Sequence, residues 1–230
     1  MLINLDTGVL FIFAISGISS IGILMAGWGS GNKFSMLGGI RAGAQLVSYE
    51  IPRVLSVVPA LMFYGSQSLQ TIAVAQHGRW LGCLPKWFVF YPVFGQLSFL
   101  IFLIASVAET NRTPFDLPEA ESELVAGFHT EFSGMKFALF FLAEYAYVFI
   151  AAAMASALFL GGGDGFLADW IPSWIWFLAK TVALIFVIFW FRWTLPRLRV
   201  DRLMQLCWQF LLPWSLVSIV LAAGWILWRR

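Results

Sequence analysis

Six mostly apolar stretches, each about 20 residues long, constrain what this chain can fold into, because a helix of that length crosses a bilayer. They cover residues 8–28, 43–64, 87–108, 135–160, 174–193 and 206–228. Only 11% of the 230 residues are charged, whereas about a quarter are charged in a soluble domain. The sequence therefore predicts an all-α polytopic membrane protein. We expect a single membrane domain over residues 1–230, with a bundle of about six transmembrane helices.

Basic residues between these stretches fall unevenly on two sides. One side carries Lys33, Arg41, Arg112, Lys136, Arg192, Arg197, Arg199 and Arg202. The other carries Arg79, Lys86, Arg229 and Arg230. Since loops rich in lysine and arginine stay in the cytoplasm, the first side is expected to be cytoplasmic and both termini periplasmic.

Charge and cysteine content exclude several functions. A net charge of +2 gives no support for nucleic-acid binding. Cys83 and Cys207 lie far apart and lack the spacing of a zinc or iron–sulfur site. Any redox centre is then a small molecule or belongs to a partner. We also find no internal repeat of the kind that builds secondary transporters.

The connection over residues 109–134 is unusually acidic. It holds six of the 12 acidic residues of the chain, namely Glu109, Asp116, Glu119, Glu121, Glu123 and Glu131. Asp116 followed by Pro118 and Glu119 predicts the start of a short helix. Apolar residues between the acids favour a loop folded against protein. The alternative is a solvated loop whose acids only favour a helix N-terminus.

Two further carboxylates, Glu50 and Glu144, lie inside predicted spans. An ionisable group there costs a few kcal/mol, so it usually faces the bundle interior and has a function. Crowded carboxylates in a low-dielectric site can pass protons near neutral pH. The pattern therefore predicts a proton or cation path from the acidic loop into the bundle. A structural alternative pairs Glu50 with Arg53, and Glu144 with Lys136 or Lys180.

One long motif covers most of the acidic connection and the start of the span that follows it. The segment NRTPFDLPEAESELVAGFHTEFSGMKFALFFLAEY, over residues 111–145, closely resembles the signature loop of the H-subunit family of bacterial proton-translocating NADH:quinone oxidoreductase, respiratory complex I. Shorter matches follow the same order at Met36–Glu50 and Leu195–Met204, and FLAKT around Lys180 is also similar. The resemblance extends over essentially the whole chain, but the family usually has two further spans before the first one seen here, which supply a wall of its quinone chamber.

This resemblance implies a membrane subunit that helps form a quinone-binding chamber and couples quinone reduction to proton translocation in the bacterial inner membrane. Such a subunit is part of a translocase and is not catalytic alone. The implied cofactor is quinone, bound as a substrate together with partner subunits. The chain itself would hold no covalent cofactor, cluster or metal. The implied partners are peripheral-arm quinone-site subunits, small membrane subunits and membrane lipids.

The resemblance also assigns candidate residues. Those expected on the proton path are Glu50, Asp116, Glu119, Glu121, Glu123, Glu131, Glu144 and Lys180. Those expected to line the quinone chamber or organise the loop are Arg41, Arg112, Phe115, Phe128 and His129. Lys180 has two other interpretations, a snorkelling side chain or a partner of Glu144. His129 has no second ligand at metal spacing, which favours a proton relay or a structural hydrogen bond.

Three other functions stay open at this point. The first is the homologous membrane subunit of a membrane-bound hydrogenase-type complex, which neighbouring genes would distinguish. A free-standing secondary transporter is the second, and it requires a repeat or a helix broken at the midplane. The third is a purely structural assembly subunit, which leaves the intramembrane acids without a role.

Overall fold

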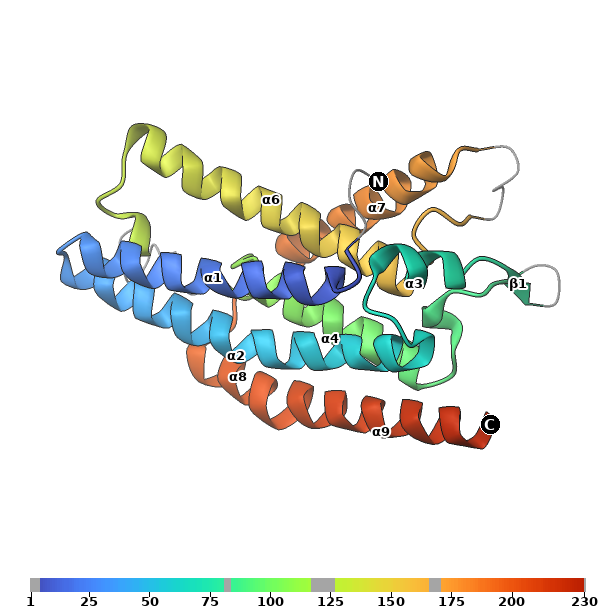
Figure 1. Cartoon of the computed structure of the whole chain (residues 1–230). Helices are drawn as coiled ribbons and strands as arrows, with labels where there is room; N and C mark the ends of the chain where they lie inside the picture. The colour runs from blue at the N-terminus through green and yellow to red at the C-terminus, as the bar shows by residue number, and fades with distance from the viewer. Residues whose placement is uncertain (1–4, 81–83, 117–126, 166–170, 230) are drawn as a thin grey trace.

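A computed structural model describes residues 5–80, 84–116, 127–165 and 171–229 (Figure 1). Helices dominate it: α1 Gly8–Gly29, α2 Lys33–Tyr64, α3 Leu69–Ala75, α4 Phe94–Glu109, α6 Gly134–Phe159, α7 Ser173–Thr194, α8 Val200–Gln205 and α9 Leu212–Arg229. Short 3-10 turns occupy Phe88–Phe90 (η1) and Gly127–His129 (η2), and a π-helical turn occupies Leu206–Leu211 (η3). Two short antiparallel strands, β1 Arg79–Trp80 and β2 Leu84–Pro85, pair Arg79 with Pro85.

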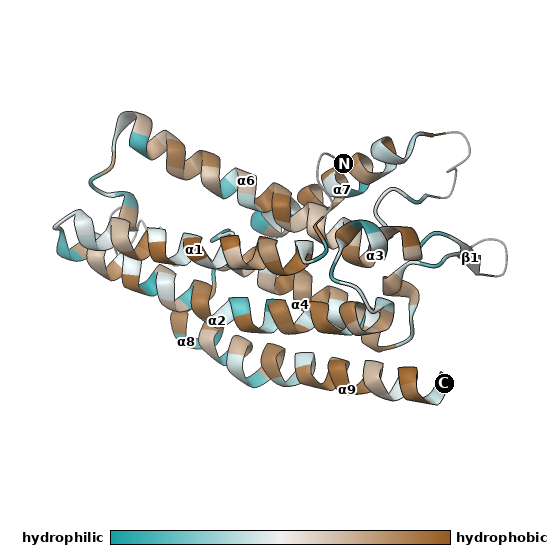
Figure 2. Ribbon diagram, viewed as in Figure 1, coloured by the Kyte–Doolittle hydropathy of each residue, from teal (hydrophilic) through white to brown (hydrophobic). Residues whose placement is uncertain are grey.

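The all-α membrane architecture is confirmed. Five helical segments are long and apolar enough to cross a membrane, over Gly8–Gly29, Lys33–Tyr64, Gly134–Phe159, Ser173–Thr194 and Val200–Arg229. The sixth expected span is the shorter apolar helix α4. Large apolar side chains such as Leu10, Phe186 and Val220 are exposed on the outside of the bundle. Apolar residues recur along the length of every long helix (Figure 2), as contact with lipid requires.

Helix α2 is the centre of the bundle. It packs against α1, α4 and α9, while α6 and α7 pack against each other and α6 also contacts α4 (Figure 1). The described connections at 30–32 and 127–133 lie at the left end of the bundle in Figure 1, which we call the loop end, and those at 110–116 and 195–199 lie on the same side but further in. The acidic loop begins beside the middle of α2, where Gln45 binds the Ala108 and Phe115 carbonyls, and ends beside the turn between α1 and α2, where Asn32 donates to Glu131.

Two expected helix starts differ from the structure. Helix α4 begins at Phe94 instead of residue 87, because Pro92 lacks the N–H that a helix interior requires. Val93 has φ 65° and ψ −67°, and the Phe94 N–H donates to the Pro92 carbonyl at 2.8 Å, which forms a tight γ-turn before the helix. Helix α2 begins at Lys33 instead of residue 43, so its first turns precede the predicted span.

Close contact between α1 and α2 explains this early start. A Cβ atom on Gly27 would lie 2.9 Å from the Gly39 Cα and 3.0 Å from the Ser35 carbonyl oxygen. Gly39 and Gly43 are four residues apart on the facing side of α2, a small-residue spacing that lets membrane helices approach closely. The segment at 33–42, which precedes the predicted span, is helical because its glycines pack against α1.

Helix α2 also contains Pro52 in its interior. Proline has no N–H, so the Ser48 carbonyl, one turn earlier, lacks its usual helical donor. The Cys207 thiol in η3 donates to this carbonyl at 3.0 Å. A side chain of the last span thus satisfies the freed backbone group, which a membrane interior requires.

Candidate functional site

A cavity of about 410 Å³ lies toward the loop end, between α1, α2, the end of α4 and α6. Its size is within the usual range for small-molecule sites. Apolar side chains make most of the wall, and two carboxylates face it. The lining residues are Ser19, Gly22, Ile23, Leu46, Glu109, Thr110, Asn111, Phe128, Phe140, Ala143, Glu144 and Tyr147.

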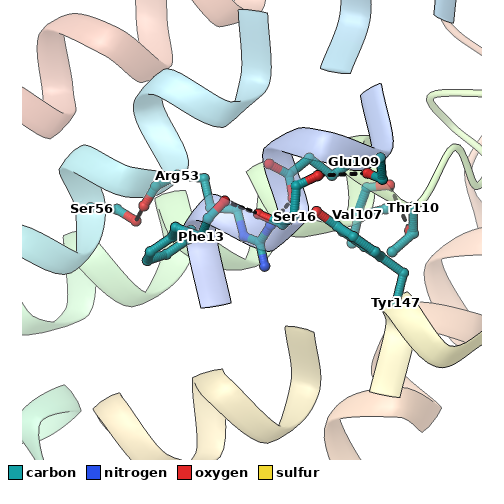
Figure 3. A network of polar contacts seen from close by, with 9 residues as sticks. Phe13, Ser16, Arg53, Ser56, Val107, Glu109, Thr110 and Tyr147 are labelled. Carbon is teal, nitrogen blue, oxygen red and sulfur yellow. Dashed lines mark hydrogen bonds and ion pairs between the residues drawn. The ribbon is translucent and has the colours of Figure 1, made fainter. Parts of the chain in front are cut away.

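The first carboxylate, Glu109, is the last residue of α4 and is bound by Arg53 from α2 (Figure 3). The side chains of both are almost completely buried, with 0% of Arg53 and 3% of Glu109 exposed. The Tyr147 hydroxyl lies 3.5 Å from Arg53 Nη1 and brings α6 into the same cluster. Three helices thus meet at one buried charge pair.

The second carboxylate, Glu144 on α6, lies between two basic groups. Its Oε2 is 3.4 Å from Arg112 Nη2, and its Oε1 is 3.8 Å from His129 Nε2. The Arg112 guanidinium also lies over the Tyr145 ring, with its Cζ 4.5 Å from the ring centroid. The carboxylate thus lies between a permanently charged guanidinium and an imidazole.

His129 occupies an aromatic cage. Its ring centroid is 3.7 Å from that of Phe128 and 5.3 to 5.9 Å from those of Phe137, Phe140 and Phe141. The turn that carries it is tied to α2, where the Ser35 hydroxyl donates to the Phe128 carbonyl at 3.2 Å. The cage and this tie hold the imidazole toward Glu144.

The chain after α4 is held against α2 by Gln45. Its Nε2 donates to the carbonyls of Ala108 at 2.7 Å and Phe115 at 2.8 Å. The first carbonyl belongs to the last turn of α4 and also accepts from the Asn111 N–H at 3.3 Å. The Phe115 ring packs edge-on against Tyr49 at 5.6 Å. These contacts fix the position of Glu109 at the end of α4.

Replacing Gln45 by leucine is expected to lower the free energy of unfolding by about 1–3 kcal/mol, because the buried Ala108 and Phe115 carbonyls lose the hydrogen bonds from the Gln45 amide. The measurement is the thermal transition of the detergent-extracted protein. Val47→Leu is the matched control, since Val47 is on the same helix but 51% exposed. Equal transition temperatures for the two variants would mean that Gln45 does not hold this segment.

The other candidate residues are placed as follows. Glu50 is half-buried on α2, and its side chain lies against Gly17 of α1. A Cβ atom added to Gly17 would be only 2.8 Å from Glu50 Oε1. Glu131 is exposed and accepts a hydrogen bond from Asn32 Nδ2 at 2.8 Å. Arg41 and Asp116 are half-buried near the loop end. Glu119, Glu121 and Glu123, together with the expected short helix, lie outside the described residues.

Lys180 lies away from the cavity, near the opposite end of α6. Its Nζ donates to the carbonyls of Leu160 at 2.6 Å and Gly162 at 3.0 Å, and also to that of Asp164. The ammonium group is 4.1 Å from the Trp87 ring centroid. In the structure Lys180 binds the carbonyls that follow α6. The described ion-pair contacts of Glu144 are instead with Arg112 and His129.

Sequence reasoning does not single out the Arg53–Glu109 pair. It groups Glu109 with the loop acids and offers Arg53 only as a neighbour of Glu50. One signal is present, because an arginine in a predicted span requires a buried anionic partner. The two residues are separated by 56 positions, so the pattern cannot say which acid it is.

Comparisons with known proteins agree with the sequence motifs. The model of the NADH dehydrogenase family matches residues 1–223. The H subunit of the NADH-quinone oxidoreductase of Geobacillus kaustophilus is 51% identical over 223 residues, which are 96% of this chain and 63% of that protein. An H subunit of the same enzyme from Geobacter metallireducens is 48% identical over 227 residues, 99% of this chain and 65% of that protein. The chain thus spans somewhat less than two thirds of the length of these relatives.

Proposed function

Since the chain belongs to the NADH dehydrogenase family, we propose that it is a membrane subunit of an NADH:quinone oxidoreductase, which helps form the quinone chamber and couples quinone reduction to proton translocation. The observation that carries this proposal is the cavity with apolar walls and two facing carboxylates, Glu109 and Glu144. An apolar pocket with a few convergent polar groups is the usual form of a small-molecule site.

The lining fits a quinone in chemical terms. Ile23, Leu46 and Phe140 supply apolar surface for a ring and a prenyl tail. The Tyr147 hydroxyl and the Asn111 amide supply hydrogen-bond donors suited to carbonyl oxygens. Because the chain covers only part of its relatives, we propose that partner subunits complete the chamber.

Coupling follows from electrostatics in a site of low dielectric. Negative charge that arises near the cavity on quinone reduction makes protonation of a neighbouring carboxylate more favourable. Glu144 is suited to this response because it faces the cavity and His129 lies beside it. Glu50 and the loop acids Asp116, Glu119, Glu121, Glu123 and Glu131 would extend the path. Lys180 lies near the opposite end of α6 and would take part only at a distance.

The proposed placement is the bacterial inner membrane, with the loop end in the cytoplasm and both termini in the periplasm. Lys33, Lys136 and the arginines around residue 197 gather at this end, as the positive-inside rule expects. Peripheral redox subunits would bind there, beside the acidic loop. Small membrane subunits and lipids would contact the apolar outer faces.

Glu144→Gln and Glu50→Gln are each expected to lower quinone-linked NADH oxidation in the assembled complex by about 10-fold or more, because loss of a proton-exchanging group slows a proton-coupled step. Turnover with quinone and proton pumping in vesicles are measured together. Oxidation of NADH by a water-soluble acceptor reports whether the redox arm is intact.

Asp201→Asn is the control, since Asp201 is exposed in α8 and does not line the cavity. It should keep wild-type turnover. Unaltered turnover and pumping in both glutamate variants would remove Glu50 and Glu144 from the mechanism and leave the cavity without its proposed role.

A further inference from the structure

The end of α6 that lies away from the quinone cavity finishes in a buried turn with two left-handed glycines. Helix α6 ends at Phe159, and Gly161 and Gly162 follow with φ values of 70° and 52°. Glycine adopts this backbone conformation without strain and commonly ends helices in this way. The Asp164 N–H donates to the Gly161 carbonyl at 2.9 Å and closes the turn. Because the turn is largely buried, its other carbonyls need donors from the protein.

The ammonium group of Lys180 supplies these donors. Lys180 belongs to α7 and is only 8% exposed. Its Nζ donates to three turn carbonyls, those of Leu160 at 2.6 Å, Gly162 at 3.0 Å and Asp164. A lysine ammonium has three N–H donors and no acceptor, so three carbonyls satisfy it completely. The Trp87 ring adds a cation–π contact, with its centroid 4.1 Å from Nζ. We call these three carbonyls and the Trp87 ring the ammonium cage.

Other contacts hold the cage in place without Lys180. Gln76, which follows α3, donates through Nε2 to the last carbonyls of α6, those of Ala157 at 3.2 Å and Leu158 at 3.0 Å. The Trp87 side chain packs closely on the turn, since a Cβ atom on Gly161 would lie 2.6 Å from Trp87 Cδ1. The cage should therefore keep its shape when the lysine side chain is shortened.

One carboxylate also attracts the Lys180 ammonium electrostatically, namely that of Asp164. Its Oδ1 lies 3.4 Å from Nδ1 of His77, which is its described ion-pair partner. The described hydrogen bonds of the ammonium go to backbone carbonyls instead. Carbonyl dipoles can coordinate a cation in a membrane without any anionic ligand.

We propose that the ammonium cage is a binding site for a primary ammonium ion. Lys180 fills it in the intact chain and thereby joins α7 to the end of α6. A free alkylammonium ion fills it when the Lys180 side chain is removed. This inference goes beyond the proposed function, because the cage is remote from the quinone cavity and its test does not depend on turnover.

The test compares Lys180→Ala with wild type in the detergent-extracted complex. The change leaves three carbonyls without their donor, so we expect the thermal transition to fall by about 5 °C or more. n-Propylammonium has the carbon atoms and the nitrogen that the change removes. When it is added, it should restore most of the lost transition temperature in Lys180→Ala and leave that of wild type unchanged.

Two controls accompany this measurement. Propan-1-ol has nearly the same shape as n-propylammonium but carries no charge. Lys136→Ala removes an exposed lysine at the start of α6 and should neither lower the transition nor respond to either compound. Equal restoration of Lys180→Ala by propan-1-ol would mean that filling a void, and not binding an ammonium, stabilises this helix end. No restoration by n-propylammonium would also overturn the proposed site.

Asp164→Asn is informative even if Lys180→Ala does not assemble, because it removes the carboxylate and keeps the backbone carbonyl. Its transition should lie within about 2 °C of wild type, since a pair with the partly exposed His77 contributes little. Assembly of Asp164→Asn beside failure of Lys180→Ala would support the carbonyl contacts. A loss in Asp164→Asn as large as that in Lys180→Ala would mean that the carboxylate holds Lys180, and the cage would be wrong.

Discussion

Gly27→Leu is expected to separate helices α1 and α2 and to lower the free energy of unfolding by about 3 kcal/mol, because overpacking of a close contact costs roughly this much. Gly27 meets the backbone of Gly39 and Ser35, whose nearest atoms lie 2.9 and 3.0 Å from the position that a Cβ atom would take. A backbone cannot move aside as a flexible side chain can. The added side chain must therefore push the two helices apart. The thermal transition of the detergent-extracted complex measures the loss.

Gly29→Leu is the matched control, because Gly29 is on the same helix two residues further on and no atom lies within 4 Å of its Cβ position. Both changes add the same side chain and the same helix propensity. Only the first should shift the transition to lower temperature. A similar shift in both variants would mean that the contact with Gly39 does not hold α1 against α2.

Hydropathy is sufficient to predict the membrane architecture, because the length of an apolar run is set by the bilayer thickness. It cannot predict where helices extend beyond the bilayer. Residues 33–42 lie outside the predicted span of residues 43–64, yet they form the first turns of α2. Their helix is stabilised by packing against α1. The hydropathy of a local window cannot detect packing between two separate segments. Only Pro92 indicates in the sequence that α4 begins later than residue 87.

The candidate site is predictable in part. An acid inside an apolar span must face protein, and this argument identifies Glu144 without a structure. Its contacts are not predictable, because Arg112 and His129 are 32 and 15 positions earlier in the chain. For Arg53 the sequence offers the neighbouring Glu50, which does attract it electrostatically, whereas the direct contact in the structure is with the distant Glu109. Local spacing favours neighbours on one helix, and helix packing decides the actual partner.

The same packing argument predicts a functional effect for Gly38→Ala, which is expected to lower quinone-linked turnover by about 10-fold or more, because small misplacements at a site can cost that much. A Cβ on Gly38 would lie 2.8 Å from the Phe128 nitrogen and 2.9 Å from the Gly127 Cα. The turn that carries His129 must then move away from α2. This movement would strain the Ser35 hydrogen bond to Phe128 and shift His129 relative to Glu144.

Stability and function should respond differently in this variant. In a helix interior, alanine is more stabilising than glycine by about 1 kcal/mol. Helix α2 itself should therefore persist, and the complex should assemble. Gly43→Ala is the control, because its Cβ would meet the Leu24 side chain, which can rotate aside, instead of backbone. Quinone-linked NADH oxidation and pumping are compared for the two assembled variants. Equal turnover in both would mean that the position of His129 does not matter for coupling, and that the contact between α2 and the 127–129 turn serves the fold alone.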